Sequence, residues 1–419
     1  MAVADLNGDG KLDIVTANSI ANNLNSCSIN IFTNDGMGNL SSNAIFEIAP
    51  NPCCVVAADL FGRGKKDLVV SFAGQTITPP GINSAFITIF TNNGAGVYGS
   101  NATYLTANDW GGNCVAADLN GDGRLDLAVL NYDFFNRTST LTILTNNGSG
   151  GFELSAAINP GVGAQYMQAA DVNGDGSVDL ITADTYSTQT VFTNNGFGVF
   201  GVHSVLNTSN NLTSFMVADV NGDGSPDLIT GDIYYNSGSY SYSLSIFTND
   251  GTGAFSLSAT IPVGNESYFV VAADLNGDGS TDLVSLNSNS LTVLTNNGSG
   301  DFGYNTTIPV DYEPGLGLAA DLNHDGKMDL VVDTEFSRFT VLTQVPFVPP
   351  VLQIQNAGQN TLLSWSCYSS DFLVQTNSHL STSNWVDCGY PVATSLDYTN
   401  FSMSLTSAPA DKLFFRLEQ

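Results

Sequence analysis

The sequence predicts an all-β protein, with a seven-bladed β-propeller followed by a small β-sandwich domain. The prediction rests on two motifs that keep the same order along the chain. An aspartate-rich loop of nine residues occurs seven times, roughly 50 residues apart, and six copies are followed by a Thr-Asn-Asn-Gly or Thr-Asn-Asp-Gly turn. Four short strands fit each interval, as in a propeller blade, whereas β-helix repeats are much shorter and sandwich domains about twice as long. The loops begin at Asp5, Asp59, Asp118, Asp171, Asp219, Asp274 and Asp321.

The sixth repeat shows the expected elements of a blade most clearly. A short apolar run predicts a buried first strand, two further strands follow the loop, and an Asn-Gly turn leads to an outer strand, because this dipeptide readily adopts the positive φ angles of a hairpin turn. In chain order these elements are Phe269–Ala273, the loop Asp274–Asp282, Leu283–Leu286, Leu291–Thr295, the turn Asn296–Gly300 and Phe302–Pro309.

The seventh repeat departs from this pattern. Phe339–Thr343 is followed by Gln344–Pro350, which has no Asn-Gly turn and no outer strand. We therefore expect the propeller to occupy residues 1–344, a stiff proline-rich linker residues 345–350, and the β-sandwich residues 351–419. Because Met1 is only a few residues from the first loop, we also expect that the chain begins inside a strand and that a signal peptide lies upstream.

The charge balance excludes several classes of function. The 419 residues include 10 Lys+Arg and 39 Asp+Glu, which gives a net charge of −29. Binding to DNA or RNA needs basic side chains against the phosphates, so we expect no nucleic-acid partner. No apolar run is long enough to span a membrane. The 42 glycines, with abundant Asn, Ser and Thr, indicate the many tight turns of a β-rich protein.

The repeated loop has the composition of a calcium site. Positions one, three, five and nine carry oxygen donors, position six is glycine, and the carbonyl of position seven can complete the set; oxygen ligands on a flexible loop favour Ca²⁺ over zinc, copper or magnesium. Position twelve is never glutamate and strands flank the loop, so it is not an EF-hand. The alternative is a series of Asx-turns without metal. The predicted ligands of about six ions are Asp5, Asn7, Asp9, Lys11 and Asp13; Asp118, Asn120, Asp122, Arg124 and Asp126; Asp171, Asn173, Asp175, Ser177 and Asp179; Asp219, Asn221, Asp223, Ser225 and Asp227; Asp274, Asn276, Asp278, Ser280 and Asp282; and Asp321, Asn323, Asp325, Lys327 and Asp329.

The second loop breaks the pattern and predicts a blade without metal. Phe61 and Arg63 replace the oxygen donors at positions three and five. We expect Arg63 to bridge Asp59 and Asp67 in place of the ion. In the seventh loop His324 replaces a glycine at position four, which supplies no ligand, so that site is retained.

The six cysteines show no Cys-x-x-Cys spacing, which leaves zinc and redox motifs unsupported. Cys367 and Cys388 could form a local disulfide in an oxidising compartment. Cys53 and Cys54 alternate faces of one strand, so at most one of them readily reaches Cys27 or Cys114. Buried thiols are the alternative.

The Asp-x-Asn-x-Asp-Gly-x-x-Asp loop, two strands and the Asn-Asn-Gly-x-Gly-x-Phe turn resemble the FG-GAP/VCBS repeat of integrin α-like propellers across residues 1–345. This resemblance implies seven blades, structural Ca²⁺ and an extracellular setting, with the calcium loops on one face and ligands on the other. The tail resembles a β-domain that closes exported proteins of Verrucomicrobia-type bacteria, in the segments Leu363–Trp365, Phe372–Thr376, Trp385 and Phe414–Leu417.

Aromatic residues precede or enter the first strands of several blades, on the face where the resemblance places ligands. Such side chains stack on sugar rings or anchor a protein partner, although they can equally pack between blades. The candidate ligand-binding residues are Trp110, Tyr166, Phe215, Tyr268 and Tyr312. A second set, after the second strands, comprises Tyr132, Phe134, Phe135, Tyr186, Tyr234 and Tyr235.

These observations favour a secreted or cell-surface module that binds an extracellular glycan or protein, is stabilised by calcium, and is monomeric and non-catalytic. The alternative is a carbohydrate-active enzyme, a polysaccharide lyase or glycoside hydrolase, or an accessory domain of one, because paired carboxylates can cleave glycosidic bonds. The chain has only 3 histidines and no G-x-S-x-G or H-E-x-x-H motif, so no catalytic residue is assigned. A third possibility is a structural matrix component without a small ligand.

Overall fold

In the computed structural model the chain forms two compact units, Met1–Gln344 and Val345–Gln419. In the first unit the structure describes residues 1–18, 27–76, 83–107, 112–133, 136–186, 188–208, 211–236, 239–264, 266–310, 314–334 and 338–343. In the second unit it describes the backbone of seven strands.

The first unit is built of seven antiparallel sheets, and the first six have four strands in chain order. The first three blades comprise β1 (Ala2–Ala4), β2 (Asp13–Asn18), β3 (Ser28–Asn34) and β4 (Leu40–Glu47); β5 (Pro52–Ala58), β6 (Asp67–Thr76), β7 (Asn83–Asn92) and β8 (Tyr98–Ala107); and β9 (Cys114–Ala117), β10 (Asp126–Asp133), β11 (Thr138–Asn146) and β12 (Phe152–Ile158).

Blades four to six repeat this arrangement. They comprise β13 (Ala164–Ala170), β14 (Asp179–Asp184), β15 (Thr188–Asn194) and β16 (Phe200–Asn207); β17 (Asn211–Ala218), β18 (Asp227–Asn236), β19 (Ser239–Asn249) and β20 (Phe255–Val263); and β21 (Ser267–Ala273), β22 (Asp282–Asn287), β23 (Ser290–Asn296) and β24 (Phe302–Pro309). Among the described residues the seventh blade has three strands, β25 (Gly317–Ala320), β26 (Asp329–Thr334) and β27 (Arg338–Leu342).

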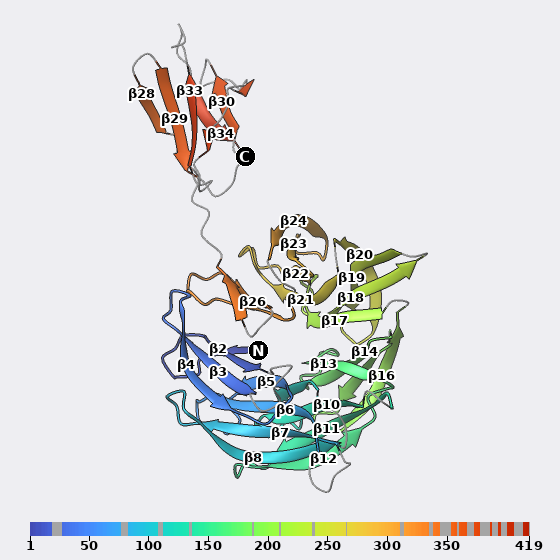
Figure 1. Ribbon diagram of the computed structural model, residues 1–419. Helices are drawn as coiled ribbons and strands as arrows, with labels where there is room; N and C mark the ends of the chain where they lie inside the picture. Colours follow the sequence, from blue (N-terminus) through green and yellow to red (C-terminus); the bar gives the residue numbers. More distant parts are fainter. Residues whose placement is uncertain are drawn as a thin grey trace. The chain divides into compact units, whose positions relative to one another are not determined.

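The blades close into a ring. The first strand of each blade contacts the first strand of the next, and β25 of the seventh blade contacts β1 of the first (Figure 1). At this closure the rings of Phe32 and Phe339 meet edge to face, with centroids 4.8 Å apart. The predicted all-β fold and seven-bladed propeller are therefore confirmed. None of the described segments forms a helix with the length and hydropathy needed to span a bilayer.

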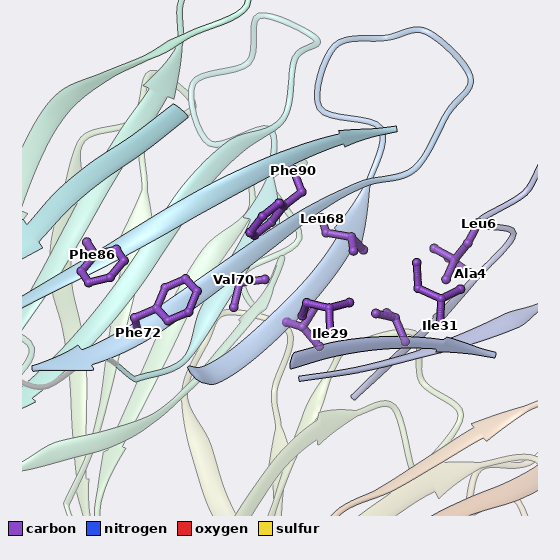
Figure 2. Close-up of a cluster of buried hydrophobic side chains, with 11 residues drawn as sticks. Ala4, Leu6, Ile29, Ile31, Leu68, Val70, Phe72, Phe86 and Phe90 are labelled. Atoms are coloured by element: carbon purple, nitrogen blue, oxygen red, sulfur yellow. The ribbon is translucent and has the colours of Figure 1, made fainter. Parts of the chain in front are cut away.

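Hydrophobic clusters lie between neighbouring blades. Figure 2 shows one of them, in which Ile29 and Ile31 of the first blade pack with Leu68 and Val70 of the second. All four side chains are fully buried. Because each sheet is covered by a neighbour on both faces, its middle strands are buried along their length, as in β14, where every residue is buried, including the polar Asp179, Thr182 and Asp184. Outer strands such as β4 are mostly exposed.

The strand order determines which loops share an end of the propeller. Because successive strands are antiparallel, the connections from first to second strand and from third to fourth strand lie at the same end of every sheet. We call this the loop end, since it holds all seven aspartate-rich loops. The connections from second to third strand, and from one blade to the next, lie at the opposite end.

The second unit contains two antiparallel sheets. One has the order β28-β29-β33-β32 and the other β31-β30-β34. Their strands are β28 (Gln353–Ala357), β29 (Asn360–Ser366), β30 (Leu373–Asn377), β31 (Val386–Asp387), β32 (Ala393–Thr394), β33 (Asn400–Leu405) and β34 (Phe414–Glu418). The packing of these sheets as a sandwich stays a prediction.

Candidate functional site

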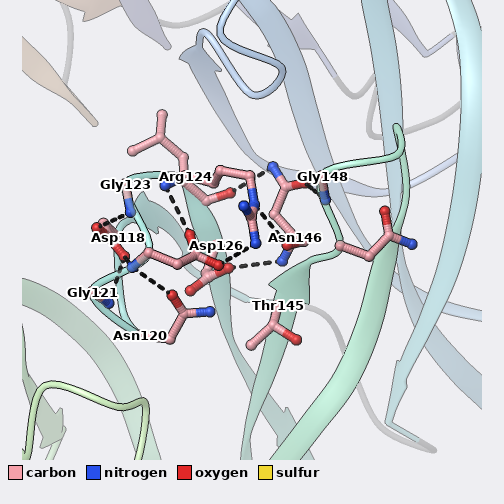
Figure 3. Close-up of polar contacts among 12 residues, drawn as sticks. Asp118, Asn120, Gly121, Gly123, Arg124, Asp126, Thr145, Asn146 and Gly148 are labelled. Carbon is pink, nitrogen blue, oxygen red and sulfur yellow. Dashed lines mark hydrogen bonds and ion pairs between the residues drawn. The ribbon is translucent and has the colours of Figure 1, made fainter.

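Each aspartate-rich loop is wound around its first aspartate. In the third blade, Asp118 accepts hydrogen bonds from the backbone N–H groups of Gly121 and Gly123, both at 2.8 Å (Figure 3). Both glycines have positive φ, which lets the backbone turn inward toward the carboxylate. The backbone N–H of position six donates the same hydrogen bond to the first aspartate in other loops, namely to Asp5, Asp171, Asp219, Asp274 and Asp321.

Positions three and five support the next turns of the loop. Asn120 Oδ1 accepts the N–H of Asp122 at 3.0 Å, and Asp122 Oδ1 accepts the N–H of Arg124 at 2.9 Å. These hydrogen bonds are Asx-turns, the alternative that the sequence left open for these loops. Asx-turns and ion binding are compatible, because each accepting oxygen has a second lone pair.

The ninth-position aspartate is fully buried and anchors the loop to the sheet. Asp126 accepts the N–H of Leu119 at 3.2 Å and that of Asn146 at 2.7 Å, one on each oxygen. Desolvation raises the pKa of this carboxyl, and the neighbouring loop aspartates Asp122 and Asp118 raise it further. Burial likewise raises the pKa of Asp13, Asp179, Asp227 and Asp282.

The donor chemistry of these loops fits a hard cation. The donors are carboxylate and amide oxygens, and a buried carboxylate surrounded by other carboxylates gains from a nearby positive charge. In the part of the chain that the structure describes, however, no three acidic, histidine or cysteine side chains are grouped closely enough to hold an ion. Coordination would require the side chains at positions one, three and five to draw together.

The second blade differs as the sequence indicated, with one correction. The Arg63 guanidinium pairs with Asp67, Nη2 to Oδ1 at 2.5 Å, and lies 5.1 Å from the centroid of the Phe61 ring. The expectation that the Arg63 side chain also bridges to Asp59 is wrong. Asp59 instead accepts the backbone N–H of Arg63 at 2.8 Å. A guanidinium thus contacts the buried carboxylate in the loop that lacks two oxygen donors.

The rearranged second loop leaves one polar atom without a partner. Leu60 donates its N–H to the carbonyl of Ala58 at 3.0 Å, whereas the equivalent residue elsewhere donates to the ninth-position aspartate. Asp67 Oδ2 is consequently buried with no hydrogen-bond partner. In the seventh blade, His324 adopts φ 60°, the conformation that glycine has at this position in other loops. Its loop keeps the bond from Gly326 N–H to Asp321.

The first asparagine of the glycine turn has a role that sequence reasoning missed. Asn146 is buried, and its Nδ2 donates to the carbonyl of Leu60 in the preceding blade at 2.7 Å and to that of Leu125 in its own blade at 3.2 Å. Its backbone N–H is the donor to Asp126. The same bond to the preceding blade is made by Asn34, Asn92, Asn194, Asn249 and Asn296.

Two predicted ligand-binding aromatics line a central cavity at the opposite end. The cavity has a volume of about 190 Å³ and is lined by first-strand residues of several blades, among them Cys54, Tyr166, Phe215, Phe269 and Gly317. Phe215 is only 4% exposed, so it belongs to the core as much as to the cavity wall. Tyr166 donates its hydroxyl to the carbonyl of Thr213 at 3.1 Å.

The remaining predicted aromatics are distributed differently. Tyr268 is partly buried, and its hydroxyl bonds Glu266 Oε2 at 3.0 Å. Trp110 and Tyr312 lie outside the described residues, as do Phe134 and Phe135. Of the three described residues predicted to bind a ligand, Tyr166 and Phe215 therefore share one cavity wall, and Tyr268 does not line that cavity.

Exposed tyrosines gather at the opposite end on the connections between second and third strands. Tyr234, Tyr235 and Tyr240 flank the β18–β19 connection and are 47%, 61% and 63% exposed. The rings of Tyr235 and Tyr240 lie 4.9 Å apart. Tyr186 of the fourth blade is 53% exposed and lies 5.2 Å from the Arg137 guanidinium of the third. All four tyrosine side chains are thus about half or more exposed.

The described cysteines form no disulfide. Cys54 Sγ lies 3.8 Å from the carbonyl oxygen of Cys114, so Cys54 is the member of the adjacent pair that approaches another cysteine. Desolvation raises the pKa of both thiols. Cys367 and Cys388 lie outside the described residues, and their pairing stays a prediction.

A family model described as FG-GAP-like repeat matches residues 5–70, 77–129, 171–230, 231–285 and 274–332, which is more than half of the chain. No curated protein sequence matches the chain significantly.

Solved structures with a similar fold have low sequence identity. A lectin from Agrocybe aegerita, described as recognising non-reducing terminal N-acetylglucosamine, is 21% identical; the match covers 74% of this chain and 80% of the lectin, with a TM-score of 0.48. BBS1N, in complex with ARL6DN, is 10% identical over 82% of this chain and 91% of its own, with a TM-score of 0.57. A protein from Lactobacillus plantarum is 13% identical over 85% and 92%, with a TM-score of 0.54. The latter two similarities show a shared fold.

Proposed function

The chain belongs to the FG-GAP-like repeat family, and from this premise we propose that it is a secreted or cell-surface, calcium-stabilised module that binds a glycan or protein without catalysis. A propeller of this family fits a binding module, because a rigid ring presents many loops on one end. The proposal separates two tasks. The loop end stabilises the ring, and the opposite end binds the ligand.

The observation that supports this most strongly is the group of exposed tyrosines at the opposite end. Tyr234, Tyr235 and Tyr240 are each about half or more exposed on one hairpin, although tyrosine buries much of its surface in most folds. Tyrosine supplies a flat apolar face and a hydroxyl at a low cost in conformational entropy, which suits both sugar stacking and protein contacts. We assign ligand binding to this hairpin, together with Tyr186 on the corresponding connection of the next blade toward the N-terminus.

Calcium would be held by positions one, three, five and nine of six loops, with the carbonyl of position seven. Six divalent ions would offset about twelve of the excess negative charges of a chain with net charge −29. The ion would supply charge neutralisation to a loop whose amides already hold the first aspartate in place. The role is therefore structural, and no residue of the loops is assigned a catalytic one.

An extracellular setting follows from the same proposal. Millimolar calcium outside cells would keep loops of modest affinity occupied. The low lysine content and the abundance of asparagine, threonine and glycine agree with export.

A glycan array with a matched pair of variants tests the proposed binding end. We expect wild-type protein in calcium-containing buffer to bind a defined subset of glycans or, on a secreted-protein array, a defined protein. The variant Tyr234→Ala/Tyr235→Ala/Tyr240→Ala should lose that binding. Phe197→Ala removes an aromatic side chain that is 80% exposed at the loop end and should retain it. Retention by the tyrosine variant, or depolymerisation of a bound polysaccharide, would refute the proposal.

A further inference from the structure

A cavity at the loop end, between the second and third blades, contains two arginines. Its volume is about 490 Å³, which lies within the range of small-molecule sites, about 300–1,000 Å³. Its wall includes Asp59, Phe61, Arg63, Asn101, Arg124 and Ser149. Both blades thus contribute one guanidinium to the same space.

This concentration of positive charge runs against the composition of the chain. Only 10 of 419 residues are Lys or Arg, against 39 acidic residues. Yet the second loop alone holds Arg63, Lys65 and Lys66, and the adjoining third loop adds Arg124. In the other loops position five is aspartate, and position seven is serine or lysine. The cavity therefore holds two of the ten basic residues beside one carboxylate of its wall, Asp59, whose oxygens accept the backbone N–H groups of Arg63 and Gly64.

The contacts of Arg63 hold its guanidinium in place at the cavity and leave part of it accessible. Nη2 pairs with Asp67 at 2.5 Å, and the plane lies over the Phe61 ring at 5.1 Å. Its side chain is 39% exposed. Because a guanidinium has five N–H donors in a rigid fork, this pairing leaves donors on the same group for a further acceptor.

Arg124 is held in a comparable way from the other blade. Its Nε donates to the carbonyl of Asn146 at 3.2 Å, Nη2 pairs with Asp122, and the side chain is 46% exposed. The two fixed and half-exposed guanidiniums resemble the arrangement by which arginines recognise carboxylate, sulfate or phosphate groups. Asn101 and Ser149 add an amide and a hydroxyl, which can bond the neutral hydroxyl groups of the same ligand.

We propose that this cavity binds the oxyanion group of a small ligand between Arg63 and Arg124, with an acidic saccharide unit as the ligand class. The volume admits a sugar unit but no folded protein, and the charge selects an anionic over a neutral one. The site is separate from the exposed tyrosines, which lie at the other end of the blades. It gives the loop end a binding role in addition to a structural one.

Isothermal titration calorimetry of the full chain in calcium-containing buffer tests the proposal with glucuronate, inorganic sulfate and neutral glucose. We expect glucuronate to bind and glucose not to bind. If sulfate binds as well, the site recognises any oxyanion. If sulfate does not bind, the site recognises the carboxylated sugar. Absence of heat with both anions would overturn the proposal.

Two variants distinguish a direct contact of Arg124 with the anion from a general attraction by nearby positive charges. Arg124→Ser installs the residue that occupies the same loop position as Ser177, Ser225 and Ser280, so the loop should fold. Loss of one charge-assisted contact should weaken anion binding by about tenfold or more. Lys66→Thr removes a neighbouring, partly buried charge, with the residue found at Thr281. It should leave the affinity within about twofold because Lys66 does not line the cavity. Equal weakening by both variants, or none by Arg124→Ser, would contradict the site.

Discussion

Asn34 of the first blade donates its Nδ2 to the carbonyl oxygen of Leu322 in the seventh blade, at 2.6 Å across 288 residues of sequence. The bond joins the two ends of the ring at a buried point. It is the closing member of a series, since the corresponding asparagines of blades two to six each bond the preceding blade. The same type of asparagine hydrogen bond thus closes the ring and joins blades one to six.

The first prediction concerns this asparagine. Asn194 is buried and bonds Leu119 and Val178 by its Nδ2, so Asn194→Ala should leave two backbone carbonyls without a partner. We expect a loss of about 2 kcal/mol in the free energy of unfolding, measured by urea denaturation. Asn195→Ala alters the exposed neighbour in the same turn and should cost less than about 1 kcal/mol. If both variants lose the same free energy of unfolding, Asn194 stabilises only its own turn and not the junction between blades.

The second prediction concerns calcium removal. Loop carboxylates without metal repel each other and are partly buried, so chelation should lower the melting temperature markedly. When the free Ca²⁺ concentration is about a hundred times the Kd of a site, binding there adds about 2.7 kcal/mol to the free energy of unfolding. Differential scanning fluorimetry with and without EGTA measures the shift. An unchanged melting curve, with metal loss verified by elemental analysis, would refute a structural ion.

The third prediction concerns the second loop. Replacing Phe61→Asn together with Arg63→Asp restores the ligand pattern of the third loop, Asn120 and Asp122. Elemental analysis of the dialysed protein should then give one more bound Ca²⁺ per chain than the wild type. The single substitution Phe61→Asn, which retains the guanidinium, should give no gain. If the wild type already binds seven ions, Arg63 does not replace the metal.

The fourth prediction concerns the Arg63–Asp67 pair. Asp67 is fully buried, so Arg63→Met should leave a carboxylate without its cation and destabilise the protein by about 2 kcal/mol, less than for a fully buried pair because Arg63 is partly exposed. The double variant Arg63→Met/Asp67→Asn should recover much of this loss. Urea denaturation of the four proteins in the cycle measures the coupling, and purely additive effects would argue against the ion pair.

The fifth prediction concerns thiol reactivity. Cys53 is exposed beside the central cavity, but desolvation raises the pKa of its thiol to about 11 from an ordinary value of 9.0. Because the thiolate is the reactive form, alkylation by iodoacetamide at pH 8 should be about a hundredfold slower than for an ordinary thiol. The rate should keep rising about tenfold per pH unit up to pH 10. Mass spectrometry follows the modification, with glutathione as reference, and a plateau above pH 9 would contradict the shift.

The sequence predicted the blades and the loops because both repeat within one unit. In the sixth blade the four expected strands agree with the observed ones to within a few residues, and Gly298 takes the expected positive φ. The role of Asn296 could not be read in this way. Its acceptor, the carbonyl of Val220, lies 76 residues earlier in the preceding repeat, and a repeat pattern contains no information on which atoms of two units meet.

The binding residues were less predictable for a related reason. Phe215 lies within β17, four residues before Asp219, and is buried among the core residues of two blades. Tyr268 lies near the start of β21, six residues before Asp274, and is only partly buried. The two aromatic residues thus differ in their position along the first strand, and the pairing of β21 shifts register between Ser267 and Phe269, which the sequence pattern does not indicate. The cavity between Arg63 and Arg124 had no signal beyond the clustering of basic residues in the second loop.

The direction of the asparagine bonds has a consequence for how such a protein can change in evolution. Each of the first six repeats carries a donor, the buried asparagine, and an acceptor, the carbonyl that follows the first loop aspartate, whereas the seventh repeat supplies only the acceptor, Leu322. Duplication or deletion of one of the first six repeats as a whole therefore transfers a donor and an acceptor together and leaves the remaining asparagine bonds paired. A partial duplication would orphan one half. The heritable unit of this ring is the complete blade, and lineages can vary the number of blades more easily than the length of any one.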